Sequence, residues 1–203
     1  MKAGLCIAAL LISTATFAQP ASVPGPYIID LRGAMSGAPA GISFYPPSPA
    51  DTRAPQRAFG FEVGAHVYPF ALGIARMGLG VDLMRARGTA TSISNINAAM
   101  TVTTLAPQLS FNFGTHEGWS YLSGGYGTTQ TRAEVMTPAA DTTTAATLSR
   151  ERRTRTINIG GGARWFLQER VAVGFDVRFH RLAGTGGLPS KQIVGLSVGV
   201  SIR

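Results

Sequence analysis

The 203-residue sequence predicts an all-β fold, in which eight antiparallel strands close into an up-and-down transmembrane β-barrel. Apolar and polar residues alternate with a period of 2, over segments longer than the usual soluble strand of about 5–6 residues. The connections between these segments are alternately short and long, as in outer-membrane barrels. Mean hydropathy is +0.16, yet the apolar residues are spread in alternation among 25 glycines and 12 prolines.

The expected strands lie at residues 27–35, 58–68, 76–87, 101–113, 119–129, 154–166, 171–184 and 192–203. The seventh, VAVGFDVRFHRLAG, shows the pattern well, because Val173 and Phe175 alternate with Gly174 and Asp176. The fifth, which begins at Trp119, alternates too poorly for its two faces to be assigned. Proline has no N–H to donate, so a bulge is expected in the fourth strand at Pro107.

Short turns are expected at residues 69–74, 114–118 and 167–170, and longer connections at residues 36–57, 88–100 and 130–152. A glycine-rich loop covers residues 182–190, and the segment TPAADTTTAATLS, residues 137–149, is expected to be an exposed loop. The aromatic residues should gather at the short-turn end as an interfacial girdle. They are Tyr27, Tyr68, Phe70, Phe113, Trp119, Tyr121, Trp165 and Phe166.

Residues 1–18 have the features of a secretory signal peptide: Lys2, a short apolar run, and small residues that end at Ala18. The only cysteine, Cys6, lies in this segment, so the exported chain would have no disulfide and no thiol nucleophile. Residues 19–26 form a Pro-rich lead, and residues 27–203 form the barrel. These features predict export to the bacterial outer membrane.

The formal net charge of +8 suggests an anionic partner. Export argues against nucleic acid, and no interleaved basic and aromatic surface for single strands is present. Anionic lipid headgroups of the outer membrane are the expected partner.

The residue types on the polar faces indicate which face meets lipid. A sheet facing bulk water would carry Lys, Glu and Thr, whereas these faces carry Gly, Ser, Asn and charges of both signs. Buried charges need partners, so a charge network inside the lumen is predicted. Its members are Asp30, Arg32, Glu62, His66, Arg76, Asp82, Arg164, Asp176, Arg178 and His180. A soluble secreted β-barrel that binds a small ligand remains an alternative.

The segments INIGGGARWFLQERVAVGFDVRFHRL, residues 157–182, and YLSGGYG, residues 121–127, resemble the small outer-membrane β-barrel family that includes OmpA-like transmembrane domains. The resemblance implies insertion by the barrel-assembly machinery and a monomeric barrel in outer-membrane lipid. Family members usually end in an aromatic residue that the machinery reads, whereas this chain ends Ile202–Arg203.

An eight-stranded barrel is just wide enough for side chains to fill, so a plugged lumen and a structural or surface-recognition role through the loops are expected. The alternative is a lipid-modifying enzyme, since some small barrels that deacylate lipid A carry a histidine followed two residues later by a serine. His180 occupies such a place, but Leu182 has no hydroxyl. We therefore expect no enzymatic activity, no catalytic residues, no metal site and no cofactor.

One further site is predicted at the upper rim, where arginines cluster near the loop ends. Guanidinium groups match phosphate geometry, so lipopolysaccharide is the expected contact. A solvated charge run on a loop is the alternative. The residues are Arg150, Arg152, Arg153, Arg155 and Arg181.

Overall fold

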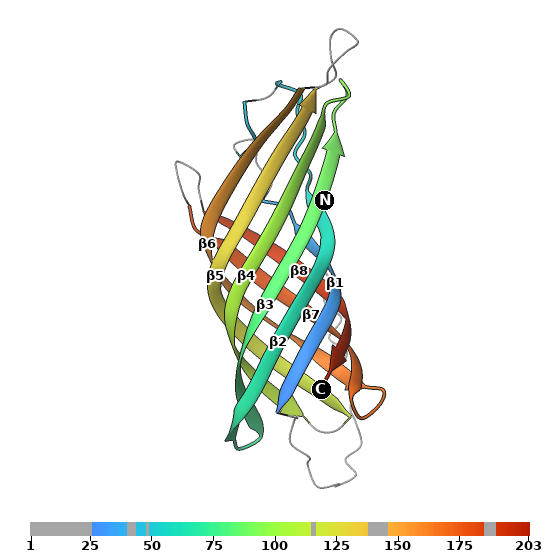
Figure 1. The fold of residues 1–203 in the computed structure, drawn as a ribbon, viewed down its shortest axis with the longest axis vertical. Coiled ribbons are helices and arrows are strands. Elements are labelled where there is room, and N and C mark those ends of the chain that lie inside the picture. Colours follow the sequence, from blue (N-terminus) through green and yellow to red (C-terminus); the bar gives the residue numbers. More distant parts are fainter. Residues whose placement is uncertain (1–25, 40–43, 48, 115–116, 138–145, 185–189) are drawn as a thin grey trace, which may run out of the picture.

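The computed structural model describes residues 26–39, 44–47, 49–114, 117–137, 146–184 and 190–203. The expected signal peptide and most of the Pro-rich lead lie outside these residues. The described part forms eight strands (Figure 1). They are β1 (Tyr27–Gly37), β2 (Arg57–Leu72), β3 (Ala75–Thr91), β4 (Asn97–Gly114), β5 (Gly118–Thr137), β6 (Ala146–Phe166), β7 (Val171–Leu182) and β8 (Lys191–Ile202).

The sheet is a closed ring in which each strand pairs antiparallel with the next, and β1 closes the ring by pairing with β8. Closure leaves no sheet edge, which is what lipid demands of backbone N–H and C=O groups. The fold class predicted from the sequence is therefore confirmed. Among the described residues, no helix is long and apolar enough to cross a membrane.

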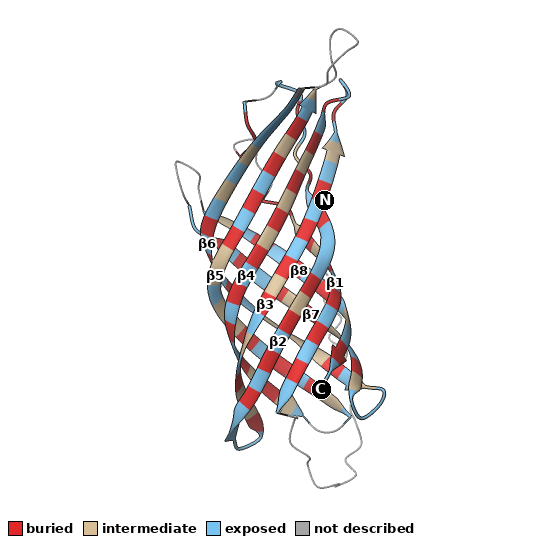
Figure 2. Ribbon diagram, viewed as in Figure 1, coloured by how far each residue is buried: buried red, intermediate tan, exposed pale blue. Residues whose placement is uncertain are grey.

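The predicted facing of the strands is also confirmed. Along β1 the Asp30 side is buried, whereas the neighbouring Leu31 is 57% exposed on the outer wall. Figure 2 shows the same alternation of buried and exposed residues along the strands. The fifth strand follows the pattern, with Trp119 and Tyr121 inside and Leu122 and Tyr126 outside.

The strands are longer than the sequence pattern suggested at one end of the barrel. β5 continues to Thr137 and β6 begins at Ala146, so most of the connection expected at residues 130–152 is strand. The connection expected at residues 88–100 shrinks in the same way. The parts of these segments that form strands contain β-branched residues, which are favoured in strands: Thr89, Thr91, Thr131, Val135 and Thr147. As a result β4, β5 and β6 extend beyond the other strands at the upper end in Figure 1.

A register shift occurs at a different proline from the one expected. In the β2–β3 pair it falls between Val67 and Phe70, around Pro69. At Pro107 the β3–β4 pairing continues without a break, and the β4–β5 ladder keeps its register on both sides of a short gap. Because Pro107 has no N–H, the pairing between β4 and β5 is interrupted there, but the register of the two strands does not change.

The aromatic girdle is only partly as predicted. Tyr27, Phe70 and Trp165 lie on the outer wall near the short turns. Tyr68 and Trp119 belong to the same end but are each 1% exposed, because they point into the lumen. Those two side chains close the barrel from inside.

Closure of the barrel depends on glycines where strands approach closely. A Cβ added at Gly162 would lie 1.9 Å from the carbonyl oxygen of Phe175, whereas one added at Gly33 would meet nothing nearer than 3.8 Å. Overpacking typically costs about 1–3 kcal/mol. Gly162→Val is therefore expected to reduce the fast-migrating folded form of the unboiled protein on a detergent gel. Gly33→Val should leave that band unchanged, and an equal loss in both variants would contradict the argument.

Candidate functional site

The lumen is filled in layers, beginning at the short-turn end with an apolar cluster. Ile28, Tyr68 and Trp119 are all 1% exposed or less, and Phe166 packs against them. The Arg203 guanidinium lies over the Phe166 ring at 4.7 Å, and it also lies over Trp119. This cluster forms a floor beneath the charged residues.

Above the floor, Asp30 of β1 is the centre of the first ionic group. Arg164 of β6 donates two hydrogen bonds to its carboxylate, at 2.9 and 2.7 Å. The Arg32 guanidinium contacts the same carboxylate at 2.7 Å, and the Ser201 hydroxyl donates to it at 2.5 Å. Arg32 also donates to Glu62 of β2 at 3.1 Å. One carboxylate thus joins three strands of the barrel wall and extends to a fourth.

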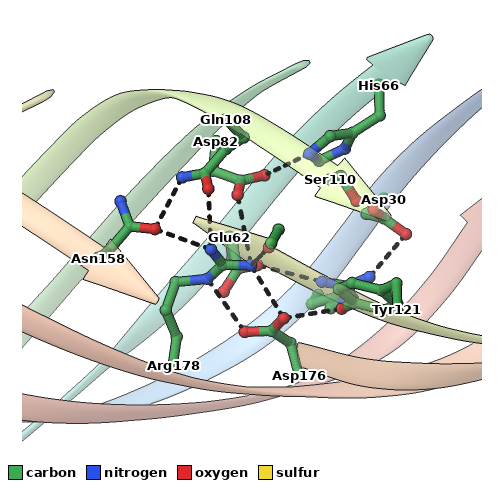
Figure 3. Close-up of polar contacts among 12 residues, drawn as sticks. Asp30, Glu62, His66, Asp82, Gln108, Ser110, Tyr121, Asn158, Asp176 and Arg178 are labelled. Carbon is green, nitrogen blue, oxygen red and sulfur yellow. Dashed lines mark hydrogen bonds and ion pairs between the residues drawn. The ribbon is translucent and has the colours of Figure 1, made fainter. Parts of the chain in front are cut away.

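Arg178 of β7 is the centre of the second group (Figure 3). It donates two hydrogen bonds to Asp176, at 3.2 and 3.0 Å. Its remaining donors bind Gln108, Asn158 and Ser123 at 3.1, 2.9 and 2.8 Å. An ion pair of 3.5 Å to Asp82 of β3 completes the set. A guanidinium with this many partners is well compensated for the loss of water.

Tyr121 connects the two groups. Its hydroxyl donates to Asp176 at 2.8 Å, and the Arg164 guanidinium lies 3.9 Å from its ring centroid. His66 lies at the edge of the network, 3.9 Å from Asp82. The network therefore spans the barrel as one connected body of side chains.

Nine of the ten residues predicted for the lumen network are buried, each 7% exposed or less. Four of them carry carboxyl groups and three carry guanidinium groups, so the opposite charges nearly balance. Arg76 differs, because it is half-buried at the short-turn end and makes no ion pair within the described residues. His180 is buried but likewise has no ion pair there.

The long-connection end of the lumen holds two layers that the sequence reasoning missed. The first is a set of hydroxyls, in which Thr129 bonds to Thr104 and Thr156 at 2.8 and 2.7 Å. The second is an apolar cluster that includes Met100, Val102 and Val135. Met100 and Val135 lie in segments that the sequence pattern predicted as connections. Val102, Thr104, Thr129 and Thr156 lie in predicted strands, but they carry no charge and so were not assigned to the lumen network.

The β1–β2 connection completes this apolar cluster. Phe44 and Tyr45 are 6% and 2% exposed and pack into it. Burial raises the pKa of Tyr45. Arg150 of β6 donates to the Tyr45 carbonyl at 3.0 Å, and Ser92 donates to Asp51 at 3.1 Å. The connection is thus held over the lumen by the strands around it.

Between these layers lies a cavity of about 10 Å³, whose lining includes Glu62, Asp82, Arg178 and His180. That volume suits about one water molecule. It offers no room for a solute.

The arginines predicted to contact lipopolysaccharide lie on two faces of β6 and β7. Arg153, Arg155 and Arg181 are exposed on the outer wall. Arg150 and Arg152 belong to β6 rather than to a loop, and they lie on its opposite, inward face. The period of 2 separates them from the other three, so the five cannot form one surface.

Three outward arginines from other strands join this surface, and the sequence reasoning did not include them: Arg85, Arg87 and Arg132. A single cross-strand row runs from Arg85 through Thr103 and Gln130 to Arg153. We call the six exposed residues the arginine belt: Arg85, Arg87, Arg132, Arg153, Arg155 and Arg181. The sequence pattern predicts that these arginines face outward, but the pairing of the strands decides which of them lie next to one another.

The positive charge of two residues of the arginine belt is neutralised by an ion pair to a neighbouring carboxylate. Glu134 pairs with Arg87 at 3.2 Å and with Arg132 at 2.9 Å. Arg153 donates to the Thr128 hydroxyl at 3.4 Å. Within the described residues, the other belt arginines form no salt bridge to a carboxylate.

Residues 5–201 match the family described as "Outer membrane protein beta-barrel domain". The chain belongs to this family. It is an outer-membrane β-barrel protein, and its location is the bacterial outer membrane. No curated protein matches the sequence.

Solved structures with the same arrangement include Ail, the attachment invasion locus protein of Yersinia pestis. Ail is 11% identical, with a TM-score of 0.55 over 87% of this chain and 96% of that chain. A second structure of Ail, in complex with the heparin analogue sucrose octasulfate, is 11% identical with a TM-score of 0.54 over the same shares. The Neisserial surface protein A is 13% identical with a TM-score of 0.49, over 88% and 97%. The two Ail structures show that this chain and Ail share the barrel fold.

Two features of the described residues concern the possibility of a catalytic nucleophile or a metal site in this barrel. Leu182, at the position that a serine nucleophile would take, is 1% exposed inside the lumen. Among the described residues, no group of three or more His, Cys, Asp or Glu side chains could hold a metal ion.

Removing the central carboxylate tests the energetic role of the network. Asp30→Asn would leave Arg164 buried without its bidentate partner, and breaking a buried pair costs about 3–5 kcal/mol. Glu134→Gln, which breaks only exposed pairs, should cost less than about 1 kcal/mol. Urea unfolding in phosphatidylcholine vesicles measures both, and equal small effects would contradict a structural role for the network.

Proposed function

We propose that this protein is a closed, non-conducting barrel that acts as a structural and recognition element of the outer membrane. Its arginine belt would bind phosphates of lipopolysaccharide. The observation that carries the first part is the layered filling of the lumen, in which a floor, an ionic network, hydroxyls and an apolar cluster follow one another. A solute would have to break several buried ion pairs to pass.

The position of the arginine belt supports the second part. On β3 and β6 the outward residues change from apolar to arginine along one direction: Leu83 is followed by Arg85, and Ile157 is preceded by Arg155. The change occurs toward the long connections, which face the outside in outer-membrane barrels. Phosphates of the outer leaflet lie at that depth, and arginine binds them bidentately.

We further infer that residues 1–18 are removed as a signal peptide, that the barrel-assembly machinery inserts the chain, and that the barrel is monomeric. We propose no enzymatic activity. A histidine needs a hydroxyl or thiol partner to act as the base of a nucleophile, and the position two residues after His180 holds Leu182.

Planar-bilayer recording tests the closed lumen. Purified monomer is expected to give no stable conductance steps, because ion pairs and apolar layers fill the whole cross-section. A general porin reconstituted in the same bilayers serves as the positive control. Large and stable steps from the monomer would overturn the proposal of a plugged barrel.

Lipopolysaccharide binding tests the arginine belt. Changing Arg153, Arg155 and Arg181 to Gln should weaken binding by about 1 kcal/mol per arginine. That is about two orders of magnitude in affinity, measured by titration and by co-purification. The control variant, Arg170→Gln/Arg203→Gln, removes charge at the short-turn end and should bind normally. Binding unchanged in the triple variant would refute this role.

Sucrose octasulfate, which Ail binds in its crystal structure, is a suitable soluble polyanion for a competition experiment with this chain. If the arginine belt recognises phosphate by charge, the sulfated sugar should displace lipopolysaccharide from the native barrel. It should displace little from the triple variant, in which little is bound.

A further inference from the structure

The outer wall of the barrel is not uniformly convex. A groove of about 1010 Å³ runs across the lipid-facing side of β4–β7. Its sides are formed by aromatic residues that are only half exposed, namely Phe111 and Phe113 of β4 and Phe175 of β7. Its floor is formed by β5 and β6, where the small residues Ser120, Gly124, Gly161 and Ala163 alternate with Leu122 and Ile159.

The two glycines of the floor differ in how much space surrounds them. A Cβ at Gly161 would lie 2.5 Å from the Tyr121 carbonyl oxygen, so the sheet itself requires glycine there. A Cβ at Gly124 would meet only ordinary contacts, at 3.5 Å from Ile159 and 3.6 Å from the Asn158 carbonyl. Nothing within the protein therefore excludes a side chain at Gly124, although a large one would project into the groove.

The groove ends beside the arginine belt. Phe179 of β7 lines the groove and stands opposite Ile159 of β6. The next outward pair along the same two strands is Arg181 opposite Ile157, and Arg155 follows on β6. Both arginines are exposed and form no salt bridge to a carboxylate within the described residues. Two cations thus stand at the mouth of an apolar groove.

The grooves on the other side of the barrel are smaller. A groove of about 520 Å³ on β1–β3 is lined by Ile29, Val67 and Leu79 among others. Two grooves of about 330 Å³ lie between β1, β2 and β8, and one of them has Arg57 in its lining. The β4–β7 groove differs from these in its larger volume and in the two exposed arginines beyond its end.

We propose that the β4–β7 groove holds one acyl chain of the phosphorylated outer-leaflet lipid whose phosphate Arg155 and Arg181 bind. This rests on the proposed function of the arginine belt and names the form of the ligand. A flexible acyl chain can pass over the small residues and around Leu122 and Ile159, between the aromatic sides. The two exposed arginines at the end of the groove complement a phosphate headgroup, which the apolar wall of a second barrel does not offer. Lipid tails and groove are equally apolar, so the selectivity comes from close packing together with the phosphate contact.

The test uses bisphosphorylated lipid A with a photoreactive diazirine in one acyl chain, at low density in phosphatidylcholine vesicles that contain the full-length barrel. The variants are Gly124→Leu, which places a large side chain in the floor of the groove, and Arg155→Gln/Arg181→Gln, which removes the two cations. Gly33→Leu is the matched control, because it adds the same side chain to the smaller outward groove. Unboiled gel mobility verifies that each variant is folded, and Ala163→Leu replaces Gly124→Leu if that variant does not fold.

In the native barrel, photoproducts should concentrate on Leu122, Phe175 and Phe179 rather than on Phe59 and Leu196. Gly124→Leu should lower lipid A affinity and groove labelling roughly fivefold, since only packing is lost. It should leave sucrose octasulfate binding unchanged, and Gly33→Leu should behave as the native barrel. The double arginine variant should weaken both lipid A and sucrose octasulfate binding, by roughly thirtyfold each, since about 1 kcal/mol is lost per arginine.

Each contrary result has its own meaning. Labelling spread evenly around the barrel, or lipid A affinity unchanged in Gly124→Leu, would overturn the acyl groove while leaving the arginine belt intact. Unchanged binding in Arg155→Gln/Arg181→Gln would overturn the proposed function itself. A native-state mass that falls from dimer to monomer in Gly124→Leu would assign the groove to a second copy and refute the proposal.

Discussion

The bidentate pair between Asp30 of β1 and Arg164 of β6 joins two strands that are not neighbours in the sheet. At the middle of this barrel the lumen has no apolar core to hold its opposite walls together, because the apolar clusters lie at its two ends and the other apolar side chains face lipid. Attraction between charges inside the lumen takes that place. Both side chains are 1% exposed, so neither can exchange its partner for water, and losing either one would leave an uncompensated charge in the interior.

The remaining layers of the lumen protect this pair. Trp119 and Tyr68 exclude water from below, and the cluster around Met100 excludes it from above. With water excluded, each hydrogen bond of the Arg178 and Asp30 groups is electrostatically stronger than it would be in solution. The arrangement that stabilises the barrel would therefore also close it, which is why the proposed structural role and the proposed absence of conductance belong together.

The proposed recognition role of the outer surface depends on the length of the strands. β4, β5 and β6 extend well beyond the ionic layer, and this extension carries outward arginines past the apolar band on the same side that holds the large groove. The side formed by β8, β1 and β2 has smaller grooves, and its exposed outward arginine at this end is Arg57, at the start of β2. The wall of the barrel is thus chemically asymmetric, and lipid around it meets two different surfaces.

The sequence by itself determined the fold and the facing of the strands, since a period of 2 with Gly, Ser and paired charges on one face has a single arrangement in a membrane. The sequence also predicted correctly that nine of the ten network residues face the lumen, because the alternation of polar and apolar residues along each strand is enough to assign the face of each side chain. The alternation within one strand does not predict that Asp30 pairs with Arg164 or that Arg85 lies in the same cross-strand row as Arg153. It also does not predict that the register shifts at Pro69 rather than at Pro107. Those facts depend on pairing between strands far apart in the chain, and only closure of the barrel decides it.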